Sequence, residues 1–130
     1  MNRGSQKRVY LALPYTHRDY EIRNRRFEEV NRLAARAMMN GYTIFSPISQ
    51  SHPISTYLPE STETWDFWQK QDLPWLERCD EVWVLKLDKW DESVGVLGEI
   101  KHARACGIPI FYIEPQDWNL DPIKVADRGF

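Results

Sequence analysis

The segment EVWVLKL at residues 81–87 is the strongest strand signal in the chain, because β-branched and aromatic residues dominate it. A charged loop follows, and Ser93 can then cap a helix that is predicted to run to Cys106 and to stop at Gly107. A further strand is predicted directly afterwards, at residues 108–113. A strand, a helix and a second strand in this order are typical of a parallel sheet.

The same alternation precedes this segment. It comprises a strand at 8–13, an amphipathic helix at 19–40, a strand at 42–45, a polar loop at 46–61 and a helix from about 62 to 79. Pro74 is expected to kink that last helix or to open its second half. The pattern predicts an α/β fold, a flavodoxin-like doubly wound parallel sheet of four to five strands with helices on both faces.

Composition narrows the class of protein. The 130 residues suggest a single domain, with a core at about 8–114 and an irregular tail at 115–130. The formal charge of −2 offers no basic excess for gripping a nucleic-acid polymer. No apolar stretch is long enough for a membrane span and the N-terminus is polar, so a cytoplasmic location is expected. Neither Cys79 nor Cys106 belongs to a CxxC pair, and both are expected to be reduced thiols at packed helix ends.

Ligands of such sheets bind beyond the carboxyl ends of the strands, which here points to residues 13–18 and 88–93. Gly95 and Gly98 then fall within the first turns of a predicted helix, where each glycine costs about 1 kcal/mol relative to alanine. Close approach of a ligand is one reason for them, and tight packing of the helix is the other. Glu99 follows directly.

Three blocks, at residues 92–109, 9–16 and 72–84, carry a family likeness that extends over most of the chain. Together they resemble the nucleoside 2-deoxyribosyltransferase superfamily. The resemblance implies that Glu99 is the nucleophile, that Tyr10 hydrogen-bonds it and that Asp72 contacts the base. It also implies assembly into a homodimer or larger oligomer.

Ser93 matches a position that differs between branches of this superfamily. It is an aspartate in the nucleoside transferases and a serine that contacts the 5′-phosphate in the deoxynucleoside-monophosphate N-glycosidases. The glycine-rich turn that the second branch carries after its first strand is replaced here by Pro14-Tyr15-Thr16-His17-Arg18. An ordinary helix cap is the alternative role for Ser93.

Cleavage of an N-glycosidic bond needs a carboxylate that captures the sugar and a second group that protonates the departing base. Glu99 suits the first task, because both a Tyr10 hydrogen bond and the helix dipole are expected to favour its ionised form. Asp72 suits the second, which requires a raised pKa. Tyr15 is a candidate for stacking on the substrate and Arg18 for pairing with a phosphate, with core packing and a solvated face as their alternatives.

No metal or other cofactor is expected. Glu99 and His102 have the Glu-x-x-His spacing of carboxylate metal sites, but the sequence shows no second copy of it. His17 and His52 are expected in loops, in solvent-facing or capping roles.

The predicted function is therefore N-glycosidic bond cleavage or 2-deoxyribosyl transfer on a small-molecule nucleoside or its 5′-monophosphate, through a glycosyl-glutamate intermediate. The alternative is a non-catalytic nucleotide-binding sensor or accessory module on the same fold. An aromatic cluster on the helix at 62–79, formed by Trp65, Phe67, Trp68 and Trp75, is expected either in the core or in a subunit interface.

Overall fold

The computed structural model describes residues 7–117 and contains one sheet of parallel strands. The strand order is β2-β1-β3-β4. The strands are β1 (Arg8–Ala12), β2 (Thr43–Phe45), β3 (Glu81–Leu85) and β4 (Ile110–Ile113). From β1 the chain first builds outward to β2 and then crosses to β3 and β4 on the other side, so the strand order reverses between β1 and β3.

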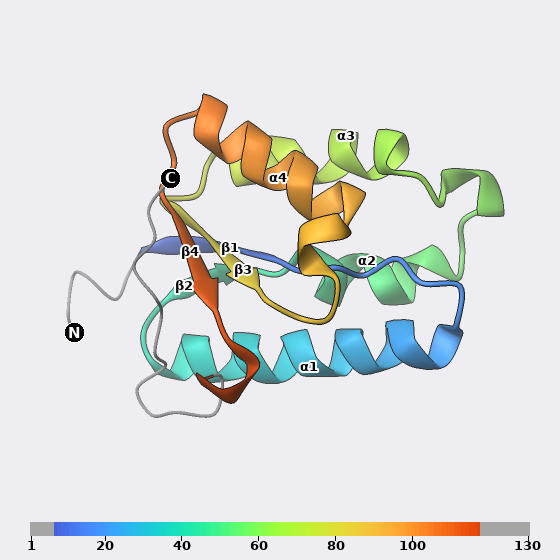
Figure 1. Cartoon of the computed structure of the whole chain (residues 1–130), viewed down its shortest axis with the longest axis horizontal. Helices are drawn as coiled ribbons and strands as arrows, with labels where there is room; N and C mark the ends of the chain where they lie inside the picture. Colours follow the sequence, from blue (N-terminus) through green and yellow to red (C-terminus); the bar gives the residue numbers. More distant parts are fainter. Residues whose placement is uncertain (1–6, 118–130) are drawn as a thin grey trace.

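Helices cover both faces of this sheet (Figure 1). The helices are α1 (Tyr20–Met39), α2 (Pro47–Ser55), α3 (Trp65–Leu76) and α4 (Val94–Ala105). Helix α1 lies on one face, and α3 and α4 lie side by side on the other. The predicted doubly wound α/β fold is confirmed, with four strands in the described residues. None of the described helices combines the length and apolar character that a membrane crossing requires.

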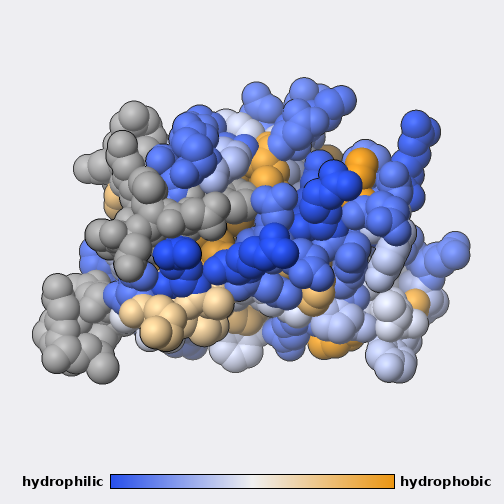
Figure 2. Space-filling view, turned by 90° about the horizontal axis from the view of Figure 1, so that it is seen from below, coloured by the Kyte–Doolittle hydropathy of each residue, from blue (hydrophilic) through white to orange (hydrophobic). Residues whose placement is uncertain are grey.

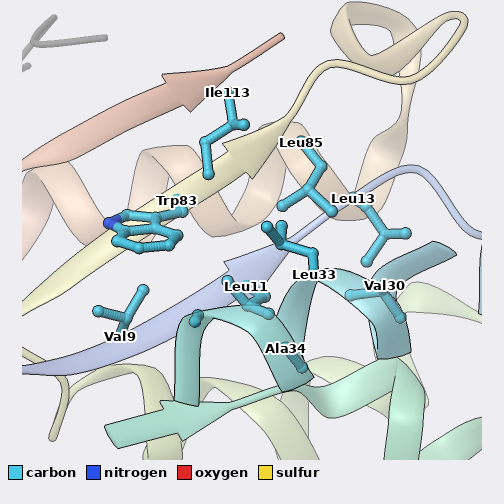
Figure 3. Packing of buried hydrophobic residues seen from close by; sticks show 10 residues of the cluster. Val9, Leu11, Leu13, Val30, Leu33, Ala34, Trp83, Leu85 and Ile113 are labelled. Atoms are coloured by element: carbon cyan, nitrogen blue, oxygen red, sulfur yellow. The ribbon is translucent and has the colours of Figure 1, made fainter. Parts of the chain in front are cut away.

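Strand β1 divides its side chains between two cores, because successive residues of a strand point to opposite faces. Val9, Leu11 and Leu13 pack with α1 and with Trp83 of β3 (Figure 3). Tyr10 and Ala12 face the other way, into the core beneath α3 and α4. The alternation therefore places one tyrosine of the central strand under the helix that carries Glu99.

Helix α1 begins and ends close to the predicted positions. The Asp19 side chain accepts a hydrogen bond from the backbone N–H of Glu21 at 2.9 Å, and Gly41 adopts a φ of 95° just beyond the helix. The molecule seen from the side of α1 is mainly hydrophilic (Figure 2). This helix therefore packs on the sheet with one face and presents charged side chains to solvent with the other.

The prediction of a loop at 46–61 is wrong, because most of this segment forms the helix α2 and a 3₁₀ turn at Glu60–Thr62. Pro47 occupies the first turn of α2, where a missing backbone N–H costs no hydrogen bond and the fixed φ suits a helix. Proline therefore begins this element rather than excluding it. His52 consequently lies on a helix with its side chain buried, which corrects its expected solvent-facing position.

Helix α3 begins later than predicted, at Trp65, where the Thr64 side chain accepts a hydrogen bond from the N–H of Phe67 at 3.1 Å. The helix continues through Pro74 to Leu76, so its second half is not opened. Because Pro74 stands in the last turn, it removes a single hydrogen bond near an end that would soon terminate anyway.

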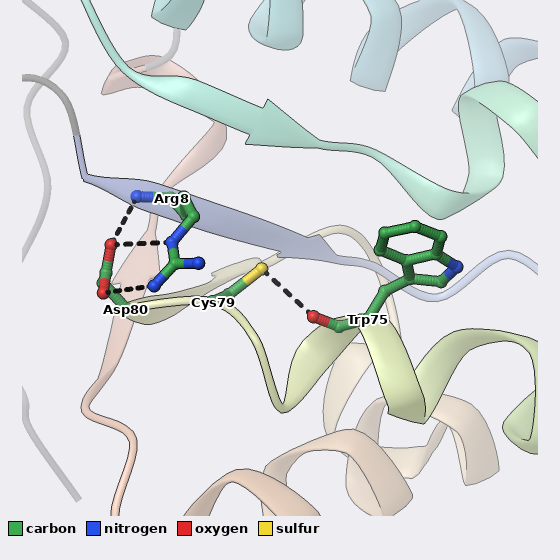
Figure 4. Close-up of polar contacts among 4 residues, drawn as sticks. All are labelled: Arg8, Trp75, Cys79 and Asp80. Carbon is green, nitrogen blue, oxygen red and sulfur yellow. Dashed lines mark hydrogen bonds and ion pairs between the residues drawn. The ribbon is translucent and has the colours of Figure 1, made fainter.

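The chain enters β3 through a polar connection to the start of β1 (Figure 4). The Asp80 carboxylate accepts hydrogen bonds from the backbone N–H of Arg8 at 2.8 Å and from its guanidinium at 3.4 Å. Cys79 donates its thiol to the carbonyl of Trp75 at 3.5 Å, and burial raises the pKa of this thiol to about 11. Both cysteines are free thiols, but Cys106 is exposed rather than packed.

The predicted tail begins with a 3₁₀ turn at Pro115–Asp117. Its remainder, 118–130, and the polar N-terminal residues 1–6 lie outside the described residues.

Candidate active site

Glu99 and Tyr10 meet in the interior, although 89 positions separate them in the sequence. Tyr10 is fully buried at the centre of β1, and Glu99 of α4 is only 6% exposed. The phenol of Tyr10 donates a hydrogen bond to Oε2 of Glu99. The contact expected between these two side chains is present, and the helix and the central strand hold it in place.

The protonation of Glu99 differs from the expectation. Burial raises its pKa to about 8, against the opposing effect of the Tyr10 hydrogen bond and together with the charge of Asp72. Glu99 lies in the second turn of α4, beyond the first backbone N–H groups through which a helix end favours an anion. Desolvation therefore dominates, and at neutral pH the Glu99 carboxyl group favours its protonated form.

Asp72 is the second acid of the site. It lies on α3, and burial raises its pKa to about 6. Its charge raises the pKa of both Glu99 and Tyr10, which places it within electrostatic reach of the pair. Within residues 7–117 no hydrogen bond joins Asp72 to either partner. The raised pKa is the property that a proton donor to a leaving base requires.

Ser93 is the N-cap of α4. Its hydroxyl oxygen accepts a hydrogen bond from the backbone N–H of Val96 at 3.2 Å, as expected of a cap. A serine hydroxyl has one proton to donate as well, so this capping bond leaves its donor function available for a ligand.

The two glycines of α4 face the side chain of Trp65, a member of the aromatic cluster expected in the core or in a subunit interface. A Cβ atom added at Gly98 would lie 2.5 Å from Cζ2 of Trp65, whereas one added at Gly95 would lie at an ordinary 3.7 Å from this ring. Gly98 is therefore required for the close packing of the Trp65 indole against α4. This contact could not be foreseen, because nothing in the local sequence pairs Trp65 with residue 98.

Tyr15 and His52 form a second aromatic and polar cluster, just beyond the carboxyl end of β1. The hydroxyl of Tyr15 is hydrogen-bonded to Nδ1 of His52, whose ring also stacks on Phe27 with centroids 4.3 Å apart. Burial lowers the pKa of His52, with a smaller contribution from the charge of Arg23. The structure thus fixes the Tyr15 ring in position from α2.

Arg18 is exposed at the surface. A different arginine, Arg26 of α1, lies where the strand order reverses. Its guanidinium approaches the carbonyl of Thr16, after β1, and that of Asp88, after β3, both at 3.5 Å. Nothing in the local sequence indicates that an arginine of this helix spans two loops.

The fold is shared with an enzyme of known structure. The chain superposes on the 2-deoxyribosyltransferase of the psychrotolerant bacterium Bacillus psychrosaccharolyticus with a TM-score of 0.54 and 20% sequence identity, over 83% of this chain and 72% of that enzyme. The likeness establishes a common α/β fold.

Sequence comparison gives a family as well. No curated protein matches the chain. The model of the family described as "domain of unknown function (DUF1937)" matches residues 7–115, which include every strand and helix described above. The chain is therefore a member of the DUF1937 family, built on the fold of a 2-deoxyribosyltransferase.

Proposed function

We propose that this protein cleaves the N-glycosidic bond of a nucleoside or a nucleoside 5′-monophosphate, or transfers the sugar to a second base. The observation that carries the proposal is the buried Glu99, hydrogen-bonded by Tyr10 with the acid Asp72 nearby. Burial of a carboxyl group is costly for the free energy of folding unless the group is paired or hydrogen-bonded. Strongly perturbed pKa values cluster at functional sites. The shared fold with a 2-deoxyribosyltransferase agrees with this chemistry.

In the proposed reaction the Glu99 carboxylate attacks the anomeric carbon as the bond from that carbon to the base nitrogen breaks. Asp72 transfers its proton to the departing base. The covalent glycosyl-glutamate is then attacked by water or by a second base, whose proton returns to Asp72. Tyr10 orients Glu99 and stabilises it again as a carboxylate leaving group.

The acid pair holds the right number of protons for this reaction. Between about pH 6 and pH 8 the two carboxyl groups together retain one proton. In the unliganded site that proton rests mainly on Glu99, whereas the reaction needs it on Asp72. The proton must therefore shift from Glu99 to Asp72 before the attack, and the positive charge that develops on the sugar in the transition state stabilises the ionised form of Glu99.

Sugar and phosphate would lie along the first turns of α4. The six residues from Ser93 to Glu99 span about 9 Å along the helix, roughly the reach from a sugar to its 5′-phosphate. Ser93 would donate its hydroxyl proton to a phosphate, with the backbone at Gly95 and Gly98 beside the sugar. Arg18 and Arg26 are candidates for the phosphate charge, and Tyr15 for stacking on the substrate.

The experiment compares wild type with Glu99→Gln on a panel of nucleosides and 5′-monophosphates, with and without a second base, and measures free and exchanged base by chromatography. We expect wild type to release or exchange a base, and Glu99→Gln to lose at least about 10³-fold in rate. Glu92→Gln, an exposed glutamate near the start of α4, is the matched control and should retain full activity. A wild-type protein that is inert on the whole panel would refute the proposal.

A nucleotide-binding sensor is the second candidate, and the protonated state of Glu99 at neutral pH favours it, because an uncharged carboxyl group is a poor nucleophile. This candidate predicts that a nucleotide raises the melting temperature by mass action while no base is released. Thermal denaturation and chromatography on the same samples separate the two functions.

A further inference from the structure

A group of three potential metal ligands lies at the ends of α3 and α4. Among residues 7–117, one nitrogen of His102, one carboxylate oxygen of Glu77 and the sulfur of Cys106 all lie within 4.8 Å of one another. His102 Nε2 and Glu77 Oε2 are already 2.7 Å apart. His102 thus contacts a carboxylate 25 positions earlier in the chain, rather than the Glu99 suggested by sequence spacing.

Secondary structure explains why these three residues meet. His102 and Cys106 are four residues apart at the end of α4, so they share one side of the helix. Glu77 is the C-cap of the neighbouring helix α3, just as Cys106 is the C-cap of α4. Two helix carboxyl ends therefore converge on the group.

The local charge suits a cation. Each helix carboxyl end carries roughly half a negative charge from its unpaired carbonyl groups. Lys101 and Arg104 are one and two positions from His102, spacings that place side chains on other sides of a helix. A divalent ion bound by one thiolate, one carboxylate and one neutral imidazole would have its charge balanced by its ligands.

We propose that Glu77, His102 and Cys106 bind a zinc ion. Sulfur, imidazole nitrogen and carboxylate oxygen are its usual ligands, at about 2.0–2.3 Å, with water completing a tetrahedral site. Tetrahedral ligands at such distances lie about 3.4 Å apart, so Glu77 would move slightly away from His102. Glu77 and Cys106 are exposed and free to turn. On binding, the Cys106 thiol releases its proton to solvent, and His102 coordinates through the lone pair of Nε2.

The ion would tie together the two helices that carry the candidate acids, Asp72 on α3 and Glu99 on α4. The ion has no step in the proposed reaction, which uses Glu99, Asp72 and Tyr10 and none of the three metal ligands. The site is thus independent of the proposed function, and it can be tested without an activity assay.

The test uses the tag-free, chelator-treated full chain. Zinc binding is measured by titration calorimetry, and cobalt binding by the sulfur-to-cobalt charge-transfer absorption that reports a thiolate ligand. We expect one ion per chain, a cobalt absorption band and a higher melting temperature with zinc. Glu77→Gln should weaken zinc binding by more than about tenfold, and Cys106→Ser should do the same and abolish the band.

Cys79→Ser is the matched cysteine control and His17→Ala the matched histidine control, and both should bind zinc and cobalt as wild type does. Circular dichroism verifies the fold of each variant, which substitution of the exposed Glu77 and Cys106 should leave intact. The proposal is overturned if wild type binds no zinc, or if Glu77→Gln and Cys106→Ser bind it as tightly as wild type.

Discussion

At the scale of single residues, Glu99 is governed by the competition between burial and one hydrogen bond. Burial favours the neutral acid, while the Tyr10 phenol favours the carboxylate, and burial prevails. Tyr10 itself is held neutral, because burial and the adjacent carboxyl groups raise its pKa well above the ordinary value. It therefore remains a hydrogen-bond donor over the whole physiological range of pH.

The raised pKa of Glu99 makes stability depend on pH. An unfolded glutamate titrates near 4.3, about 4 units below the folded group, so between these values the folded chain binds more protons and loses stability as the pH rises. Glu99→Gln removes this loss and still accepts the Tyr10 hydrogen bond. At pH 9 we expect the free energy of unfolding of the variant to exceed that of wild type by on the order of several kcal/mol, so the variant unfolds at a higher temperature. The difference should shrink towards pH 4.

Thermal denaturation of both proteins across this pH range measures the effect. An equal difference between them at every pH would show that Glu99 is not the buried titrating group.

Catalysis should follow the same two acids. Because the reaction needs one proton on the pair, kcat/KM should be bell-shaped, with limbs near pH 6 and pH 8. Asp72→Asn should lower the rate and leave a single limb that rises with pH. Its midpoint should lie below 8, because the Asp72 charge that helps to raise the pKa of Glu99 is gone. Steady-state rates at each pH test this, and an unchanged profile in Asp72→Asn would exclude its role as the acid.

At the scale of elements, the contact between α3 and α4 determines the shape of the site. Trp65 begins α3 and lays its indole on α4 at Gly98. This close approach holds the helix of Asp72 against the helix of Glu99. The glycine in α4 is thus needed for helix packing, whatever ligand binds beside it.

The two glycines of α4 provide an internally matched pair of substitutions. Gly98→Ala would place a Cβ 2.5 Å from the Trp65 ring, and we expect it to destabilise the protein by about 1–3 kcal/mol. Gly95→Ala meets that ring at 3.7 Å, and we expect it to stabilise by about 0.5–1 kcal/mol through helix propensity. Urea denaturation measures both changes, and a stabilising Gly98→Ala would contradict the close packing.

At the scale of the whole molecule, the surface is polar over α1 and carries exposed aromatic area elsewhere. Of the aromatic residues predicted in the core or an interface, Trp65 and Trp68 are half-buried, while Trp75 is 57% exposed. The Trp75 ring stacks on Phe45 of the edge strand β2, with centroids 5.5 Å apart. An exposed, positioned tryptophan of this kind is typical of a protein interface.

We expect the chain to form a homodimer or larger oligomer through the surface around Trp75 and Phe45. Trp75→Ser should shift the protein towards the monomer, while Tyr57→Ser, which changes another exposed aromatic residue, should not. Light scattering at micromolar concentration measures the mass of each. A monomeric wild type would remove the prediction.

Some of the site could be predicted from the sequence and some could not. The continuous apolar run around Tyr10 and the placement of Ser93 before a helix are local signals, and local signals predict elements well. No local signal indicates the contacts of Arg26 or His52, because the partners of each lie in an element distant in the chain. The helix α2 was not predicted because a polar segment that contains prolines is as typical of a loop as of a helix.

The sequence by itself determined the four strands, the helices α1, α3 and α4, the parallel sheet and the residue types available for chemistry, since these depend on hydrophobic period, caps and stops within short windows. The family resemblance already implied that Tyr10 contacts Glu99. Only the tertiary structure decided that Trp65 fills the space at Gly98 and that Glu77 joins His102. It also decided the charge state of Glu99, because desolvation depends on everything packed around the group, and no stretch of neighbouring residues specifies that.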